Sequence, residues 1–304
     1  MKKIIIIFIF ALIGSTCFAG TDGTWKGGAV APSWQAIDNW VGVQPGGEDA
    51  VVTWSPINSG NNTCVLGNDA SQHRSCGTMY FTASNTAGFN IDFYALIGGD
   101  PLNLTMLVSS GSAYIKIHED VGDDIVIGRT GGGFFQLNDD LIIEHSNTTE
   151  NLSFDRPIID NEGNNCVTLD GVGTVVFSSS NTYAGGTFIQ DGTLSLTGDG
   201  TLGDASGSLY ITTGGILNIE TGVSATVQFL VLDGLVQEAG TWGSTSSSAD
   251  YQNDTYFSGT GKVTVSSSYV VCEILASELS TIPWRNVGAG IYEINFCEIV
   301  APAP

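Results

Sequence analysis

Short apolar and β-branched runs follow one another from about residue 50 onward, separated by Gly, Asn, Asp and Ser. Several runs alternate apolar and polar residues, as a half-buried strand does, and no long stretch shows the 3.6-residue period of a helix. The clearest predicted strands cover residues 91–94, 102–108, 114–117, 125–127, 141–143, 174–177 and 263–265. The pattern therefore predicts an all-β protein.

One short pattern recurs, in which a glycine leads into alternating aliphatic residues. It occurs at residues 173–177, 192–196, 215–219 and 261–265. The first three glycines are 19 and 23 residues apart, and a period near 20 is what one coil of a β-solenoid consumes. A β-sandwich is the alternative, but the Asn-Gly and Asp-Gly hairpins that would favour it are few. We expect a stacked parallel coil.

The N-terminus has the pattern of a signal peptide. Lys2 and Lys3 precede the apolar run 4–13, and small residues stand at Cys17 and Ala19. We expect cleavage after Ala19. The apolar run is shorter than the roughly 20 residues of a membrane-spanning helix, so no such segment is expected in the mature chain. Lipid attachment at Cys17 is the less favoured reading, because the residues before it match such a site poorly.

Charge narrows the classes of partner. The 304 residues include 31 Asp and Glu but only 9 Lys and Arg, which gives a formal net charge of -22. Nucleic acid and anionic lipid both require a basic surface, so neither is expected as a partner. Polysaccharides and surface proteins are the classes of partner that the charge does not exclude.

Export permits disulfides. Five cysteines remain after removal of the signal peptide. Cys64 with Cys76, and Cys272 with Cys297, are the pairings that close short local loops. Cys166 is left over and is expected to be a small buried hydrophobe.

Residues 181–187 (NTYAGGT), 191–196 (DGTLSL) and 214–219 (GGILNI) resemble the autotransporter-associated β-strand repeat, also called the passenger-associated transport repeat. Residues 232–243 and 257–265 look like the closing unit of such proteins, and the Trp-rich start, with Trp25, Trp34 and Trp40, resembles their opening. The resemblance implies a right-handed parallel β-helix in a bacterial protein exported to the cell surface or outside the cell, with the periplasm as the alternative.

The segment after the repeats differs from the family's usual end. Self-secreting relatives finish in a membrane β-barrel, and only 39 residues follow Val265. We expect no translocator of the protein's own, so that export would depend on other proteins or on a single-membrane envelope.

Four segments are predicted. They are a signal peptide at 1–19, a Trp-rich entry at 20–60, a β-solenoid at 61–268 with passenger-type repeats at 173–265, and a small C-terminal segment at 269–304. We expect this last segment to have strands at 269–271 and 291–296, a helical turn at 273–279, and a Cys272–Cys297 bridge. It is read as a cap that closes the open edge of the solenoid, rather than as a binding module with contacts at Trp284 and Arg285.

No catalytic constellation stands out. The densest acidic clusters are Glu119-Asp120, Asp123-Asp124, Asp139-Asp140 and Glu144-His145. Glycoside hydrolysis needs two carboxyl groups facing one cleft, whereas adjacent residues of a strand point to opposite faces. Turns between coils are the simpler role for these acids. Arg129, a candidate lyase base, stands alone, and no catalytic residue is assigned.

Metal and cofactor motifs are weak. Many carboxylates would suit calcium, but no nine-residue glycine-aspartate repeat and no EF-hand loop occurs. Zinc motifs are lacking, and residues 131–133 lack the Lys-Ser/Thr of a phosphate loop. We expect no cofactor, with calcium as the only cation worth testing.

Three functions are compatible with this sequence. The first is a non-enzymatic structural or adhesive protein of the cell surface or the extracellular space, whose long polar face makes many weak contacts to a glycan or a protein. The second is a carbohydrate-active β-helix enzyme that uses Asp123, Asp124, Asp139 or Asp140. The third is a subunit that assembles into filaments or a coat through its solenoid ends.

Overall fold

The structure, a computed structural model, describes residues 20–25, 40–41, 44–54, 63–66, 74–82, 89–93, 103–128, 132–161, 163–267, 284–288 and 291–294. The chain divides into two compact units, Met1–Ser268 and Tyr269–Pro304. The predicted signal peptide, Arg129, the helical turn at 273–279 and the Cys272–Cys297 bridge lie outside the described residues. Every regular element described is a β-strand, and among these residues no helix suitable for crossing a membrane is found.

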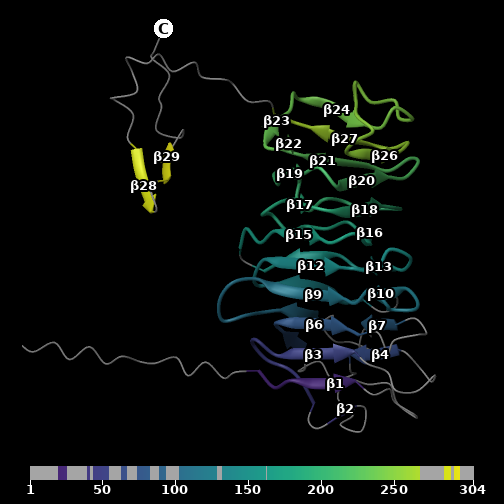
Figure 1. Cartoon of the computed structure of the whole chain (residues 1–304), viewed down its shortest axis with the longest axis vertical. Coiled ribbons are helices and arrows are strands. Elements are labelled where there is room, and N and C mark those ends of the chain that lie inside the picture. The colour runs from purple at the N-terminus through teal and green to yellow at the C-terminus, as the bar shows by residue number, and fades with distance from the viewer. Residues whose placement is uncertain are drawn as a thin grey trace, which may run out of the picture. The chain divides into compact units, whose positions relative to one another are not determined.

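The first unit is a coil of strands stacked in parallel (Figure 1). Its largest sheet has eleven strands, in the order β2 (Trp40–Val41), β1 (Gly23–Trp25), β3 (Val51–Trp54), β6 (Thr78–Phe81), β9 (Ala113–Ile117), β12 (Leu141–His145), β15 (Val167–Asp170), β17 (Thr187–Ile189), β19 (Leu209–Ile211), β22 (Leu230–Leu232) and β23 (Leu235–Val236). The second sheet has eight, in the order β26 (Phe257–Gly259), β20 (Gly215–Ile219), β18 (Gly192–Leu196), β16 (Thr174–Phe177), β13 (Asn151–Phe154), β10 (Ile125–Ile127), β7 (Phe89–Phe93) and β4 (Thr63–Leu66).

Two four-stranded sheets complete the coil. One has the order β14 (Ile158–Asp160), β11 (Phe134–Leu137), β8 (Asn103–Met106) and β5 (Arg74–Cys76), and the other β21 (Ser224–Val227), β27 (Lys262–Val265), β24 (Gly240–Gly243) and β25 (Tyr251–Gln252). The chain visits one strand of each face in turn, as in β9, β10 and β11 and then β12, β13 and β14. This order of parallel strands is that of a β-solenoid and confirms the predicted all-β parallel coil.

Coil length changes along the solenoid. In the eleven-stranded sheet Val167, Thr187, Leu209 and Leu230 are successive register partners, so each of these coils takes about 20 residues. Earlier coils are longer. The register partner of Thr78 in the next coil is Tyr114, and that of Ala113 is Leu141. The predicted period near 20 therefore holds for the repeat region alone.

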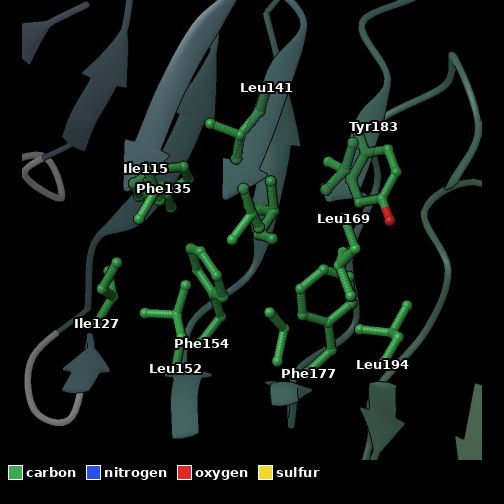
Figure 2. Close-up of a cluster of buried hydrophobic side chains, with 14 of the residues drawn as sticks. Ile115, Ile127, Phe135, Leu141, Leu152, Phe154, Leu169, Phe177, Tyr183 and Leu194 are labelled. Carbon is green, nitrogen blue, oxygen red and sulfur yellow. The ribbon is translucent and has the colours of Figure 1, made fainter. Parts of the chain in front are cut away.

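Identical core positions stack from coil to coil. One aliphatic ladder in the eleven-stranded sheet consists of Val52, Met79, Ile115, Ile143, Leu169, Ile189, Ile211 and Leu232, all buried. Figure 2 shows part of the core, where Phe154 packs edge-on against Phe135 and Phe177, with ring centroids 5.1 and 5.7 Å away. Burial of such ladders is the main stabilising contribution, at about 25 cal/mol per Å² of apolar surface.

Short antiparallel strands close both ends of the eleven-stranded sheet. β2 pairs antiparallel with β1 at one end, and β23 pairs antiparallel with β22 at the other. Each has only two residues, and a very short edge strand offers little for another molecule to pair with. The outermost strands at both ends of this sheet thus belong to the first unit itself.

The described part of the second unit is a hairpin. β28 (Trp284–Gly288) pairs antiparallel with β29 (Ile291–Ile294). The second strand lies within the predicted run 291–296. The first covers Trp284 and Arg285, for which the sequence indicated no strand.

Two expectations about the first unit need correction. The fourth glycine-led segment, at 261–265, does not join the other three in the eight-stranded sheet: β27 pairs with β21, because β26 has already taken the next place beside β20. The structure also contradicts the predicted Cys64–Cys76 disulfide. Cys64 faces the core from β4 and Cys76 from β5, in different sheets, and the Cys76 thiol lies 3.9 Å from Met106 Sδ.

Candidate functional site: a groove along one corner of the solenoid

The asparagine of the NTYAGGT segment ties three coils together. The side-chain oxygen of Asn181 accepts a hydrogen bond from the backbone N–H of Ile158 at 2.8 Å, and its amide nitrogen donates to the carbonyl of Thr201 at 2.8 Å. The side chain is 3% exposed. Buried backbone groups at a coil corner lack strand partners, and this one side chain satisfies two of them. The residue that makes the repeat recognisable is thus structural.

The tyrosine of the same segment is also part of the core. The Tyr183 hydroxyl lies 2.7 Å from Thr187 Oγ1, and the Thr187 hydroxyl donates to the carbonyl of Leu202 at 3.0 Å. Because threonine has one hydroxyl proton, Tyr183 is the donor in the first bond. Burial raises the pKa of Tyr183 well above its usual value. Neither residue is available for a ligand.

The acidic pairs singled out in the sequence hold backbone N–H groups. Asp124 Oδ1 accepts from Asn151 N at 2.7 Å, and Asp123 Oδ1 accepts from Asp124 N at 2.9 Å. Asp139 Oδ2 accepts from Val108 N at 2.9 Å, and Asp140 Oδ1 accepts from Cys166 N at 2.8 Å. Three of these four bonds link neighbouring coils. The structure thus places these carboxylates as clamps between coils and in turns, the role that the sequence favoured.

The remaining acidic clusters have other partners. Glu144 forms an ion pair with Lys116 at 2.7 Å on the outer face, while the neighbouring His145 is buried in the core. His118, Glu119 and Asp120 form the described group closest in composition to a metal site, with ligand atoms within 4.8 Å of one another. His118 Nδ1 already accepts from Asp120 N at 3.2 Å, and both acids are exposed. Nothing besides proximity marks this group as a metal centre.

Cys166 is half-buried. Its thiol pKa is raised to about 11, first by burial and then by Asp140. A thiol with a raised pKa is a poor nucleophile at neutral pH, and the strand Val167–Asp170 follows it as expected.

A row of outward-facing side chains, three of them aromatic, runs along the eleven-stranded sheet. Its half-buried members are register partners: Tyr114, Ile142, Thr168, Phe188, Tyr210 and Val231. Phe188 and Tyr210 stack on each other with centroids 4.3 Å apart and planes 1° apart, and Lys116 Nζ lies 4.4 Å from the centre of the Tyr114 ring. A sugar packs on the flat face of an aromatic ring, and one face of each of these rings is already taken by a neighbour. This row is therefore a weaker candidate than the groove on another part of the coil.

A groove of about 580 Å³ runs along the corner where strands of the eight-stranded sheet end. We call it the corner groove; its lining residues are Arg156, Pro157, Ser179, Ser180, Gly198, Asp199, Gly200, Gly222, Val223 and Ser224. They follow β13, β16, β18 and β20, which are successive neighbours in that sheet. With strands about 4.8 Å apart, four corners extend over about 14 Å along the solenoid axis.

Small residues create the hollow. A side chain at Gly200 would clash with the carbonyl of Phe177, so only glycine fits where the chain turns. Gly222 has φ +83°, which glycine adopts readily, and nothing lies within 4 Å of the place where its Cβ would be. Backbone and serine hydroxyls therefore form much of the surface.

Unused polar groups line the corner groove. The side chains of Ser180, Asp199 and Ser224 are exposed and make no hydrogen bond within the part of the chain that the structure describes. Arg156 is half-buried and donates from Nε to the carbonyl of Gly128 at 3.1 Å, which holds the guanidinium in place. These groups remain able to bind a hydroxylated or charged ligand.

The sequence did not indicate this site. Its residues come from four turns spaced about one coil apart, and each turn alone looks like an ordinary loop of Gly, Ser and Asp. Arg129 drew attention because of the neighbouring glycines, whereas Arg156, in Asp155-Arg156-Pro157, has no such signal. Only an alignment of the four turns at the spacing of one coil would have shown that these residues lie together.

The comparisons with known proteins agree with the repeat pattern. A family model described as the passenger-associated-transport-repeat matches residues 167–196, which run from β15 to β18 and include Asn181 and Tyr183. No curated protein and no solved structure matches the chain. The resemblance seen in the sequence is thereby confirmed, and the repeat implies a protein that is secreted or exposed at the surface. Residues 167–196 thus form a repeat of the kind found in autotransporter passenger proteins.

Proposed function

We propose that this protein is a non-enzymatic adhesive β-solenoid, exported to the cell surface or the extracellular space, that binds polysaccharide in the corner groove. The observation that carries the proposal is the groove itself, about 580 Å³ of space lined by serine hydroxyls, glycine turns and unused polar side chains on four successive coils.

A linear glycan suits this geometry. Each sugar offers several hydroxyl groups that both donate and accept hydrogen bonds, and the groove repeats a similar polar corner at about 4.8 Å intervals. An extended chain lying along the solenoid axis would meet one corner after another. Many weak contacts of this kind add up when a polymer is held at several points.

The clamping role of the acidic residues supports binding over catalysis. A hydrolase needs one carboxyl group held protonated and a second facing it across a cleft. Asp124, Asp139 and Asp140 each accept a hydrogen bond from a backbone N–H of another coil, and none of them lines the corner groove. The closed ends of the eleven-stranded sheet argue against filament growth by pairing of strands at those ends.

Affinity electrophoresis of residues 20–304 tests the proposal, in gels that contain a neutral β-glucan, a neutral mannan or hyaluronan. Ser224→Trp places a large side chain in the groove from an exposed position of β21. Thr226→Trp is the matched control, because Thr226 is equally exposed on the same strand and does not line the groove.

We expect at least one polysaccharide to slow the wild type and Thr226→Trp alike, and Ser224→Trp to migrate as in an empty gel. Equal retardation of both variants would place binding elsewhere, and no retardation in any gel would contradict a glycan-binding role. New reducing or unsaturated ends in the same mixtures would instead indicate an enzyme.

A further inference from the structure

We infer that the corner groove selects a glycan carrying an isolated carboxylate, such as a uronic acid flanked by neutral sugars, and that Arg156 binds this carboxylate. The inference rests on the proposed function and specifies the class of sugar that the same groove takes.

The position of Arg156 carries the argument. In a chain with 31 acidic and 9 basic residues, an arginine would be expected beside one of the protein's own carboxylates. Yet no described carboxylate forms an ion pair with Arg156, in contrast to Lys116, which pairs with Glu144 at 2.7 Å. Arg156 lines the groove instead.

The guanidinium is held in place for such a contact. Its Nε donates to the carbonyl of Gly128 at 3.1 Å, and within the described residues its other two nitrogens make no hydrogen bond. A planar guanidinium with one side fixed presents the remaining donors in a fork that matches the two oxygens of a carboxylate. Lysine would provide the charge without this geometry.

Asp199 limits how many carboxylates fit. It lines the same groove two coils beyond Arg156, since β13, β16 and β18 are consecutive neighbours, so the two side chains belong to corners about 10 Å apart. A second carboxylate at that place would meet a like charge, whereas a hydroxyl or an acetamido group could donate to Asp199. The groove therefore favours a uronic acid whose first and second neighbours along the glycan are neutral sugars over a homopolymer of uronic acid.

The net charge of -22 opposes any anion at long range. This repulsion is screened beyond about 8 Å at 0.15 M salt, while a bidentate contact between arginine and carboxylate acts at hydrogen-bond distance. We therefore expect the affinity for the acidic glycan to persist at physiological salt.

A matched pair of ligands tests the inference by isothermal titration calorimetry on residues 20–304. One is the octasaccharide of deacylated gellan, in which each glucuronate is separated from the next by three neutral sugars. The other is the same octasaccharide after reduction of its carboxyl groups, which replaces each glucuronate by glucose and leaves the linkages unchanged. The variants are Arg156→Gln, Arg156→Lys and, as a control cation on another face, Lys116→Gln.

We expect wild type and Lys116→Gln to bind the acidic ligand about tenfold more tightly than the reduced one. Arg156→Gln should lose this preference and keep the affinity for the reduced ligand within twofold, with Arg156→Lys in between. Equal affinities of wild type for both ligands would overturn the inference and leave the proposed glycan binding intact. If Arg156→Gln lowered the affinity for both ligands equally, Arg156 would have a structural role and would not bind the carboxylate. Binding of neither ligand would overturn the inference, and the affinity gels with neutral polysaccharides would then decide the proposed function.

Discussion

The side-chain oxygen of Asn181 accepts a hydrogen bond from the backbone N–H of Ile158 at 2.8 Å, across 23 positions of sequence. The backbone N–H of Ile158 in β14 is therefore bonded to a side-chain oxygen, where the next coil would otherwise supply a backbone carbonyl. The motif's asparagine replaces a strand at this corner. This replacement fits the shortening of the coils, because the step from Val167 to its register partner Thr187 is shorter than the preceding step from Leu141 to Val167.

Replacing Asn181 by alanine should lower the free energy of unfolding by about 2–3 kcal/mol, because the N–H of Ile158 and the carbonyl of Thr201 both lose their buried partner. Urea unfolding followed by circular dichroism measures the effect. Asn164→Ala, at an exposed position, is the control and should change stability by less than about 0.5 kcal/mol. Equal effects of the two substitutions would show that the bridge contributes nothing.

Tyr183 and Thr187 should behave as one unit. Tyr183→Phe removes the donor to Thr187 Oγ1, and Thr187→Val removes both that acceptor and the donor to Leu202, so each is expected to cost about 1 kcal/mol or more. The double variant should be less destabilised than the sum of the two single variants. A double-mutant cycle in urea measures the coupling, and strict additivity would contradict the hydrogen-bonded chain.

His145 should make the solenoid sensitive to mild acid. Burial lowers its pKa to about 4 from 6.5, a contact with the backbone of Glu150 partly offsets this shift, and Nε2 has no hydrogen-bond partner among the described residues. Because the unfolded chain binds the proton more tightly, the stability contribution is present above pH 6.5 and is lost as pH falls through about 4. The expected loss is about 3 kcal/mol.

Urea midpoints measured between pH 7 and 4 test this dependence, with His145→Gln, which does not titrate, and His118→Gln as the control at a more exposed position. The slope should shrink in the first variant and persist in the second. The exposed Asp233 acts in a lower window: hydrogen bonds from Thr213 and Tyr256 hold the pKa of its carboxyl below 3.8, so its contribution fades only at more acidic pH.

The buried thiols should resist labelling. Burial raises the pKa of Cys76 to about 12, and burial with Asp140 raises that of Cys166 to about 11. In residues 20–304 carrying Cys272→Ser and Cys297→Ser, Ellman's reagent at pH 8 should label none of the three remaining cysteines within minutes and all of them in urea. Rapid labelling of the folded protein would contradict the structure around Cys64, Cys76 and Cys166.

Local pattern was a sound guide to the strands and to the shorter coils. The predicted runs at 114–117, 125–127 and 174–177 coincide with β9, β10 and β16 or lie within them, because each alternates buried and outward residues with period two. The spacing of Gly173, Gly192 and Gly215 predicted the length of the shorter coils, and Gly192 and Gly215 are indeed register partners. The longer coils before residue 167 were not predicted, since their loops carry no periodic signal.

Features that depend on how the coils stack could not be predicted from the sequence. The Cys64–Cys76 pairing looked reasonable from separation in sequence, yet a corner of the coil turns the two residues into different sheets. Arg156 and Asp199 belong to one groove only because β13, β16 and β18 are neighbours. No spacing rule based on a single strand or turn would have joined them.

The short closing strands β2 and β23 separate the two ends of the solenoid from its interior, and this has a consequence for how such a protein can change length over evolution. A tandem duplication of residues 187–208, one coil in register terms from Thr187 to the residue before Leu209, would insert a further strand into the two long sheets without disturbing either closure. It would also extend the corner groove by one more turn of the Gly198-Asp199-Gly200 kind. In such a lineage, the length of the solenoid and the length of the corner groove would grow together, one duplicated coil at a time.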